Sequence, residues 1–364
     1  MSALPAGFRV VVSEFGETPL DAIEKLTTLV PMPAPDPSTL GPREVIVAVK
    51  SAQVGWVDLL MTSGQYQHMA KPPYTPGLEC AGEIVALGAE VDAVHVGDGV
   101  LVDGFLAGPR SLGKYQSQGG FASYVVVPVE AVHRLPGTLD FDQACCLLGN
   151  YETAYHCLIA RGGLSNGETV LICGASGSTG LAAVQVAKIA GATVIATGRS
   201  ESKLAIVKEH GADHVIAVKD GGFKDAVKEI TGGRGVDVVY DGVGGETSLE
   251  ALRCVKFGAR FLIVGWAATP FVAQGKGQRG APNANVLPTN LIMMKGLDVL
   301  GCPTAIGTAQ DPSIRPPRLA QILAWAKEGA IKPFVSHRFA LADYAEAMKA
   351  KWTGAVVGGC VLHP

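Results

Sequence analysis

The chain has 364 residues, enough for about two domains at roughly 150 residues each. Its 30 Lys and Arg residues and 33 Asp and Glu residues give a net charge of -3, which argues against an extended nucleic-acid-binding surface. Apolar residues make up 48% of the sequence, and no apolar run approaches the roughly 18 residues of a membrane-spanning helix. We therefore expect a globular protein with neither nucleic-acid nor membrane partners.

The eight cysteines are scattered along the chain, and none has the CxxC spacing of structural zinc sites and redox pairs. Most of them stand among apolar residues, where free cysteine packs as a small hydrophobe. The first twelve residues lack the basic and then apolar pattern of a secretory signal. These features favour a reducing, cytoplasmic location.

In the first 135 residues, short runs with alternating or continuous apolar residues are separated by glycines and prolines, which interrupt regular structure. The predicted strands are Arg43–Ser51, Gly82–Leu87, Gly99–Val102 and Gly119–Val127. The proline-rich stretch Val30–Pro37 is interpreted as an ordered surface connection. This part of the chain is predicted to be rich in strands and turns.

From about Phe141, predicted strands alternate with predicted helices. In chain order they are helix 144–160, strand 169–173, helix 181–190, strand 193–197, helix 202–210, strand 214–217, helix 223–230, strand 236–240, helix 247–254, strand 260–264, strand 297–302 and helix 317–328. This alternation predicts βαβ units and a doubly wound parallel sheet. The stretch 267–290 is interpreted as a long loop, and the tail 334–362 returns to a strand–helix–strand pattern.

Three glycines follow the strand 169–173 and open the next helix. Gly174 is expected to permit the tight turn, Gly177 to let the backbone approach a pyrophosphate, and Gly180 to let helix and strand pack closely. The exposed N–H groups and the helix dipole then favour phosphate oxygens. The alternative is a βα turn that binds no ligand. The predicted dinucleotide site also includes the loop residues Ser176, Ser178 and Thr179.

The end of the following strand predicts which dinucleotide is bound. NAD-specific sites place an acidic residue about 20 positions along the chain, where it binds the ribose 2′-hydroxyl. Here the strand ends near Gly198 without a carboxylate, and Arg199 and Lys203 follow it. Cations suit a 2′-phosphate through charge-assisted hydrogen bonds, so NADPH is the predicted cofactor. The alternative is that both are solvated cations at the start of a helix.

The stretch Gly167–Lys188 resembles the signature of the quinone oxidoreductase (zeta-crystallin) branch of the medium-chain dehydrogenase/reductase superfamily. Ser178 stands where that signature usually has glycine. Pro76–Val85 resembles a motif of the superfamily's catalytic domain, and Val238–Gly245 resembles its mid-sheet turn. The resemblance implies an α/β fold in which a Rossmann doubly wound parallel sheet is inserted in a β-rich GroES-like catalytic domain.

In this interpretation residues 1–143 and 305–364 form the GroES-like domain, and residues 144–304 form the NADPH-binding Rossmann domain. The resemblance also implies a homodimer, formed through the last Rossmann strand near Leu297–Cys302.

Zinc-dependent members of the superfamily use ligands that this chain lacks. The glycine–histidine–glutamate ligand segment appears here as Gly77-Leu78-Glu79, and leucine cannot coordinate a metal. Gly55 stands where a cysteine ligand is expected, and residues 106–118 hold no four-cysteine lobe. We therefore predict no metal site, and Glu79 is interpreted as a structural carboxylate. The zinc-free relatives reduce quinones, or the carbon–carbon double bond of enones and enoyl thioesters.

The resemblance also nominates residues around the reaction. Tyr66 resembles a substrate-pocket tyrosine able to donate a hydrogen bond or a proton, although a structural tyrosine bonded to backbone is an equal alternative. Thr153 matches a threonine near the nicotinamide, and Tyr151 and Glu152 beside it depart from the family pattern. At the end of a later strand, the predicted nicotinamide contacts are Val264, Gly265 and Trp266.

Two functions from different classes remain open. The first is an NADPH-dependent, zinc-free oxidoreductase that transfers hydride to a quinone or to the double bond of an enone or enoyl thioester. The second is a non-catalytic NADPH-binding protein of the crystallin type, because fold alone does not determine function. Lys71 and Lys114 are further candidates, as contacts for an acidic tail of the acceptor.

Overall fold

The computed structural model describes residues 4–67, 70–111, 113–218, 222–268 and 285–364. The described chain forms two compact units. Unit 1 contains residues 4–148 and 332–364, and unit 2 contains residues 149–268 and 285–331. Most of the predicted loop 267–290 lies outside the described residues.

Unit 2 is built on a six-stranded parallel sheet with the strand order β10-β9-β8-β11-β12-β13. Its strands are β8 (Thr169–Cys173), β9 (Thr193–Gly198), β10 (His214–Ala217), β11 (Val236–Asp241), β12 (Val255–Ile263) and β13 (Asp298–Gly301). The order reverses between β8 and β11, so the loops at their carboxyl ends flank the crevice where such sheets bind ligands. The predicted doubly wound sheet is confirmed.

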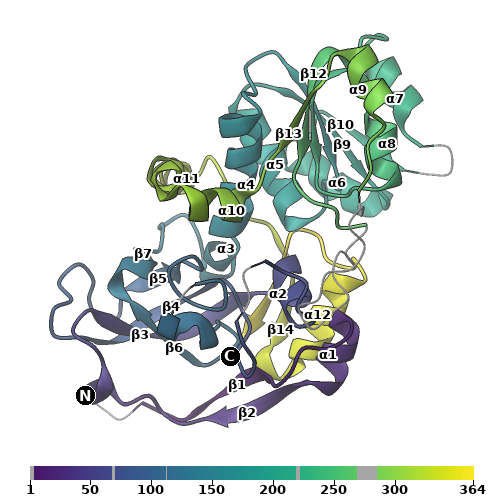
Figure 1. Ribbon diagram of the computed structural model, residues 1–364. Coiled ribbons are helices and arrows are strands. Elements are labelled where there is room, and N and C mark those ends of the chain that lie inside the picture. Colours follow the sequence, from purple (N-terminus) through teal and green to yellow (C-terminus); the bar gives the residue numbers. More distant parts are fainter. Residues whose placement is uncertain (1–3, 68–69, 112, 219–221, 269–284) are drawn as a thin grey trace. The chain divides into compact units, whose positions relative to one another are not determined.

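Helices lie on both faces of this sheet, with α5 on one face and α7 and α8 on the other (Figure 1). The helices of unit 2 are α4 (Leu148–Tyr155), α5 (Ser178–Ile189), α6 (Glu201–Glu209), α7 (Lys224–Ile230), α8 (Glu246–Ala251), α9 (Thr289–Lys295), α10 (Thr304–Gln310) and α11 (Arg315–Glu328). No helix in the described part of the chain has the length and apolar character needed to cross a membrane.

The stretch 144–160, expected to be helical from its composition, is helical but is interrupted after Cys145. The chain forms α3 (Phe141–Cys145), then α4, and then a π-helical turn over His156–Arg161. The N–H of Cys146 closes the end of α3 by bonding to Gln143 and Ala144. Composition did not predict this break, because the turn contains no proline and every residue in it is compatible with a helix.

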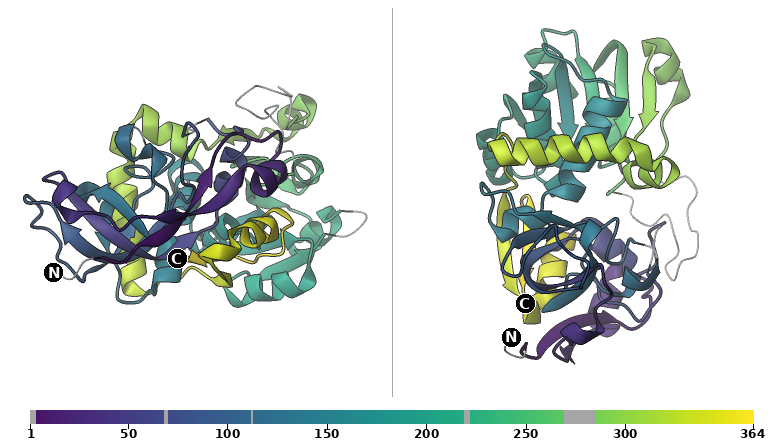
Figure 2. Two further views of the ribbon diagram at one scale, coloured as in Figure 1. Left: turned by 90° about the horizontal axis from the view of Figure 1, so that it is seen from below. Right: turned by 90° about the vertical axis from the view of Figure 1, so that its left-hand side faces the viewer.

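Unit 1 contains a seven-stranded sheet with the order β14-β15-β3-β4-β5-β7, and β6 also pairs with β3. Its strands are β3 (Glu44–Gln53), β4 (Cys80–Leu87), β5 (Gly99–Val102), β6 (Tyr124–Pro128), β7 (Val132–Arg134), β14 (Val335–Ala340) and β15 (Gly359–His363). The C-terminal strand β15 pairs with β3, so the two ends of the chain build one unit (Figure 2). The GroES-like and Rossmann-type units together confirm the predicted fold class.

A two-stranded hairpin at the N-terminus was not predicted. It consists of β1 (Gly7–Val12) and β2 (Thr27–Met32), with α1 (Pro19–Lys25) between them. Part of the stretch interpreted as a surface connection therefore belongs to a strand. Pro31 is compatible with β2 because this strand pairs with β1 alone in the described chain. The remaining helices of unit 1 are α2 (Trp56–Met61) and α12 (Tyr344–Trp352).

Candidate functional site

The glycine loop after β8 has the geometry that a close backbone turn requires. Gly174 has a φ of +68°, in the left-handed region, and a Cβ there would lie 2.7 Å from Val243 Cγ2. A Cβ at Gly180 would lie 2.6 Å from the carbonyl oxygen of Gly174, so a larger residue would force helix and loop apart. Among the described residues, a Cβ at Gly177 would meet that same oxygen alone, at 3.6 Å. No described residue therefore requires a glycine at position 177 for packing.

Helix α5 begins directly in this loop. Gly177 is its N-cap and is exposed, while Ser178 and Thr179 are its first two residues. The first N–H groups of a helix have no partner within the helix, and they carry the positive end of the helix dipole. Ser176 is half-buried beside them. The loop is thus suited to bind phosphate oxygens.

The end of β9 lies beside the glycine loop, where the N–H of Ala175 donates to Thr197 at 3.0 Å. Arg199, directly after β9, is exposed, and no carboxylate in the described chain forms an ion pair with it. Lys203 lies in the first turn of α6. Burial lowers the pKa of Lys203, and the positive charge of Arg199 lowers it further. Two cations that repel each other next to a phosphate-binding loop are well placed to receive an additional phosphate.

The turn after β11 depends on Asp241, a residue that the sequence analysis did not single out. Its side chain is buried, and it accepts hydrogen bonds from the N–H groups of Val243 at 2.9 Å and Gly244 at 3.1 Å and from the Ser248 hydroxyl. An acidic residue at the end of a buried strand, followed by glycines, is a signal that could have identified it. Asp241 thereby fixes the turn that places Val243 beside Gly174.

The predicted nicotinamide contacts lie next to this turn. The N–H groups of Val264 and Gly265 donate to the backbone oxygen of Asp241 at 2.9 and 3.2 Å. Trp266 is 42% exposed, and its Cα lies 3.0 Å from where a Cβ of Gly244 would stand. The structure therefore brings these three residues to the carboxyl edge of the sheet that also carries the glycine loop.

Thr153 lies on α4, which packs against α5, the helix that follows the glycine loop. The Thr179 hydroxyl lies 3.3 Å from Asn150 Oδ1, and the Tyr151 hydroxyl donates to Gln185 at 2.9 Å. Both contacts pack α4 against α5. The Thr153 hydroxyl donates to the Gly149 carbonyl at 2.7 Å, within its own helix. Its oxygen retains the capacity to accept a further hydrogen bond.

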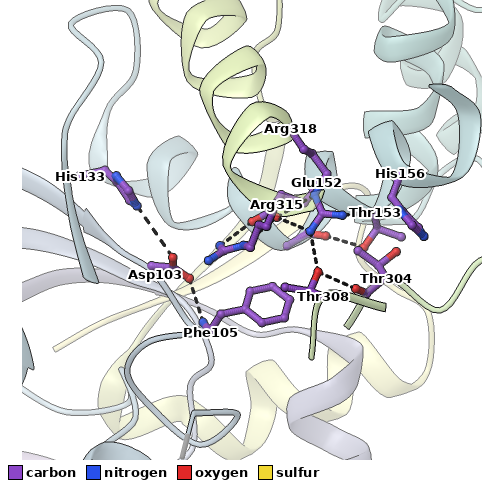
Figure 3. Close-up of polar contacts among 11 residues, drawn as sticks. Asp103, Phe105, His133, Glu152, Thr153, His156, Thr304, Thr308, Arg315 and Arg318 are labelled. Carbon is purple, nitrogen blue, oxygen red and sulfur yellow. Dashed lines mark hydrogen bonds and ion pairs between the residues drawn. The ribbon is translucent and has the colours of Figure 1, made fainter. Parts of the chain in front are cut away.

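Glu152 is the centre of a buried ion cluster (Figure 3). Arg315 donates to its two carboxylate oxygens at 2.9 and 2.7 Å, and Arg318 donates from Nε at 3.0 Å. Arg318 also donates to Thr308 at 2.8 Å. The side chains of Glu152 and Arg318 are only 1% and 2% exposed. Glu152, which departs from the family pattern, thus links α4 to α11 directly and to α10 through Arg318.

His156 lies at the edge of this cluster, with Nδ1 3.5 Å from Arg318. Burial lowers the pKa of His156 to about 4, and the positive charges of Arg318 and Arg161 act in the same direction. The folded protein therefore excludes a proton that the unfolded chain binds between about pH 6.5 and pH 4. Stability is lost as the pH falls through this window.

We expect His156 to lower the free energy of unfolding of the wild-type protein by about 2 kcal/mol between pH 7 and pH 5. The measurement is urea unfolding at both pH values for the wild type and for His156→Gln. The pH-dependent loss should be smaller in the variant by that amount, and contributions from other titrating groups cancel in the comparison. Equal losses in both proteins would show that His156 is protonated in the fold.

In unit 1, Asp58 organises the segment that corresponds to the zinc-ligand segment of the zinc enzymes. Its carboxylate accepts hydrogen bonds from the N–H groups of Gly55 at 2.9 Å, and of Gly77 and Leu78 at 3.0 Å each. Burial raises the pKa of Asp58 to about 6, against the effects of these bonds and of the positive charge of Arg110. Among the described residues, no group of three or more His, Cys, Asp or Glu side chains could hold a metal ion.

Tyr66 lies in unit 1, in the turn that follows α2, and is half-buried. Thr153 and the predicted cofactor contacts lie in unit 2. The structure thus collects the predicted dinucleotide residues in one unit and leaves the role of Tyr66 as a prediction. Lys114 forms an ion pair with Glu44, so its charge has a partner within unit 1.

Comparison with known families agrees with this architecture. Residues 41–137 match the alcohol dehydrogenase GroES-like domain, and residues 178–311 match the zinc-binding dehydrogenase family. A probable oxidoreductase from Mycobacterium abscessus has a similar structure, with a TM-score of 0.79 and 29% identity over 99% of both chains. The mycobacterial protein Rv1454c, solved in complex with NADPH, has a TM-score of 0.77 and 25% identity over 98% of this chain and all of that one.

The quinone oxidoreductase-like protein 2 homolog of Nematostella vectensis is 32% identical over 354 residues. The match covers 96% of this chain and 87% of that relative. The glycine loop, the two units and this similarity along nearly the whole chain agree with one another. The chain therefore belongs to the quinone oxidoreductase branch of the medium-chain dehydrogenase/reductase superfamily.

Proposed function

We propose that this protein is an NADPH-dependent oxidoreductase that works without zinc and transfers hydride to a quinone or to the double bond of an α,β-unsaturated carbonyl compound. The observation that carries the proposal is the pair of cations after β9, which adjoins the glycine loop and in which Arg199 forms no ion pair with a carboxylate of the described residues. The complex of the related Rv1454c with NADPH supports the choice of cofactor.

The residues of unit 2 fit this cofactor. The backbone at Gly177 and the N–H groups at the start of α5 would hold the pyrophosphate, and Arg199 with Lys203 would hold the 2′-phosphate. The backbone at Val264 and Gly265 would orient the nicotinamide amide beside Trp266. When bound, NADPH supplies the hydride.

The acceptor oxygen gains negative charge when hydride reaches a conjugated carbon. The protein must stabilise that oxygen with hydrogen-bond donors and keep the reactants in position. The Tyr66 phenol is proposed as one donor, and Thr153 as a contact of the nicotinamide. Leu78 supports a mechanism without a Lewis acid, because it replaces a ligand that the zinc enzymes need.

The test is NADPH oxidation by the purified protein, with matched sets of quinones and enones and with NADH as the control cofactor. Turnover of enones alone makes the protein a double-bond reductase, and Tyr66→Phe is then expected to lower kcat. Turnover of quinones alone makes it a quinone reductase. Tight NADPH binding without turnover of any acceptor would favour the second candidate, a non-catalytic NADPH-binding protein.

The cofactor assignment makes a separate prediction. Arg199→Ala should raise the Kd for NADPH by about 10- to 100-fold, because it removes charge-assisted bonds to a phosphate. The Kd for NADH should change less than about twofold. Titration of cofactor fluorescence measures both constants. Lys208→Ala, at an exposed lysine of α6, is the matched control. Equal losses for both cofactors would contradict the assignment.

We also propose that the protein forms a homodimer through β13. In the described chain this strand pairs only with β12, and so presents an open edge. Phe257 and Met293 beside it are 79% and 73% exposed. Light scattering should find dimers for the wild type and monomers for Phe257→Asp with Met293→Asp. A monomeric wild type would refute the proposal.

A reducing, cytoplasmic location is supported by the cysteines. All eight are buried, and none is in a disulfide.

A further inference from the structure

The segment that follows β5 in unit 1 holds Arg110 in a fixed position. Asp103 lies 1% exposed at its start, and its carboxylate accepts a hydrogen bond from the Phe105 N–H at 2.8 Å (Figure 3). At the other end, the N–H and hydroxyl of Ser111 both donate to the Gly108 carbonyl, at 2.9 and 2.7 Å. Arg110 thus extends from a hydrogen-bonded and largely buried backbone, and its position needs no ligand to form.

The guanidinium of Arg110 is partly withdrawn from water. Its Cζ lies 4.0 Å from the centroid of the Phe105 ring, and an Nη atom lies 3.4 Å from where a Cβ of Gly104 would stand. That same Cβ would lie 2.2 Å from the Leu78 carbonyl oxygen. The guanidinium is therefore a neighbour of the Gly77-Leu78-Glu79 segment and lies against one aromatic face.

This partly buried cation has no counter-charge within ion-pair distance among the described residues. Its Nε is fully buried and makes no hydrogen bond, and no carboxylate among the described residues forms an ion pair with Arg110. The charge of Arg110 acts on the nearby Asp58, but the two side chains form no ion pair, and the Asp58 oxygens accept three backbone N–H groups instead. Buried polar groups without a partner are rare in folded proteins and costly. An anionic ligand would satisfy both the charge and the open donors.

We propose that Arg110 binds a carboxylate carried by the acceptor, so that the substrates are α,β-unsaturated carbonyl compounds with an acidic group. This inference rests on the proposed reductase function and specifies its substrate class. The two oxygens of a carboxylate match the planar N–H donors of a guanidinium. A carboxylate also carries a full negative charge before hydride transfer begins. A neutral carbonyl would offset less of the unpaired positive charge.

The experiment compares 4-oxopent-2-enoate with its methyl ester, which lacks the negative charge and carries one additional methyl group. For the wild type we expect a lower KM for the acid than for the ester. Arg110→Met should raise the KM of the acid by about 10- to 100-fold and leave the ester within about twofold. Arg110→Lys should recover part of the loss. Arg9→Met, at an exposed arginine of the same unit, is the matched control. Equal effects of Arg110→Met on acid and ester, or no effect on the acid, would overturn the proposal.

A second measurement separates this proposal from the reductase function. The saturated acid 4-oxopentanoate should raise the Tm of the wild type with NADP⁺ present, and should not do so for Arg110→Met or when replaced by its methyl ester. If neither unsaturated acceptor is reduced but this shift is observed, the carboxylate site stands and the reductase function fails. If the wild type shows no shift and no preference for the acid, the carboxylate site is wrong even where the ester is reduced.

Discussion

Replacing Glu152 by alanine should lower the free energy of unfolding by about 3 to 5 kcal/mol. The change leaves Arg315 and Arg318 buried without their counter-charge, at exposed fractions of 10% and 2%. The loss is thus mainly the cost of uncompensated buried charge. Urea unfolding followed by circular dichroism measures it.

Two further variants test this explanation. Asp225→Ala removes an ion pair at the surface of the same unit, where the aspartate is 94% exposed, and should cost less than about 1 kcal/mol. Glu152→Leu combined with Arg315→Met and Arg318→Leu removes all three charges, and should be more stable than Glu152→Ala. A loss below about 1 kcal/mol for Glu152→Ala would mean that water reaches the two arginines.

Gly177→Ala should weaken NADPH binding by about tenfold or more and change stability by less than about 1 kcal/mol. The φ of Gly177 is -72°, which alanine adopts readily, and its Cβ would meet one atom of the described residues, at an ordinary contact distance of 3.6 Å. The methyl group would instead occupy the space where the backbone meets the pyrophosphate. Titration with NADPH and urea unfolding separate the two effects.

Gly180→Ala is the matched variant, with the opposite pattern. Alanine within a helix is normally more stable than glycine by about 0.5 to 1 kcal/mol. Here the Cβ would lie 2.6 Å from the Gly174 carbonyl and 2.7 Å from the Ala175 Cα, both backbone atoms. We therefore expect a loss of about 1 to 3 kcal/mol in stability. If both variants lose affinity and stability alike, the two glycines do not have separate roles.

Most of the Rossmann sheet was predictable because its signals are local. Thr169–Cys173 and His214–Ala217 have the predicted bounds, since each is a short run rich in β-branched and apolar residues with turn residues at its ends. The glycine loop was recognisable for the same reason. Its three glycines stand within seven residues of one another, between a strand and a helix.

The polar clusters were not predictable in this way. Glu152 and Arg315 are 163 positions apart, and nothing near either residue indicates a partner. Arg315 and Arg318 do lie three positions apart on one helix face, and that spacing was the available signal. Arg110 depends on the backbone path of residues 103–111 and on one aromatic ring, neither of which alternation or composition describes.

Because every cysteine is buried, the surface of the protein presents no reactive thiol. Burial raises the pKa of the Cys80 and Cys254 thiols to about 12, which keeps them in the unreactive protonated form. Because all eight thiols are buried away from the solvent, maleimide reagents should leave the native chain unlabelled. A cysteine introduced at an exposed position would then be the preferred site for attaching a fluorophore.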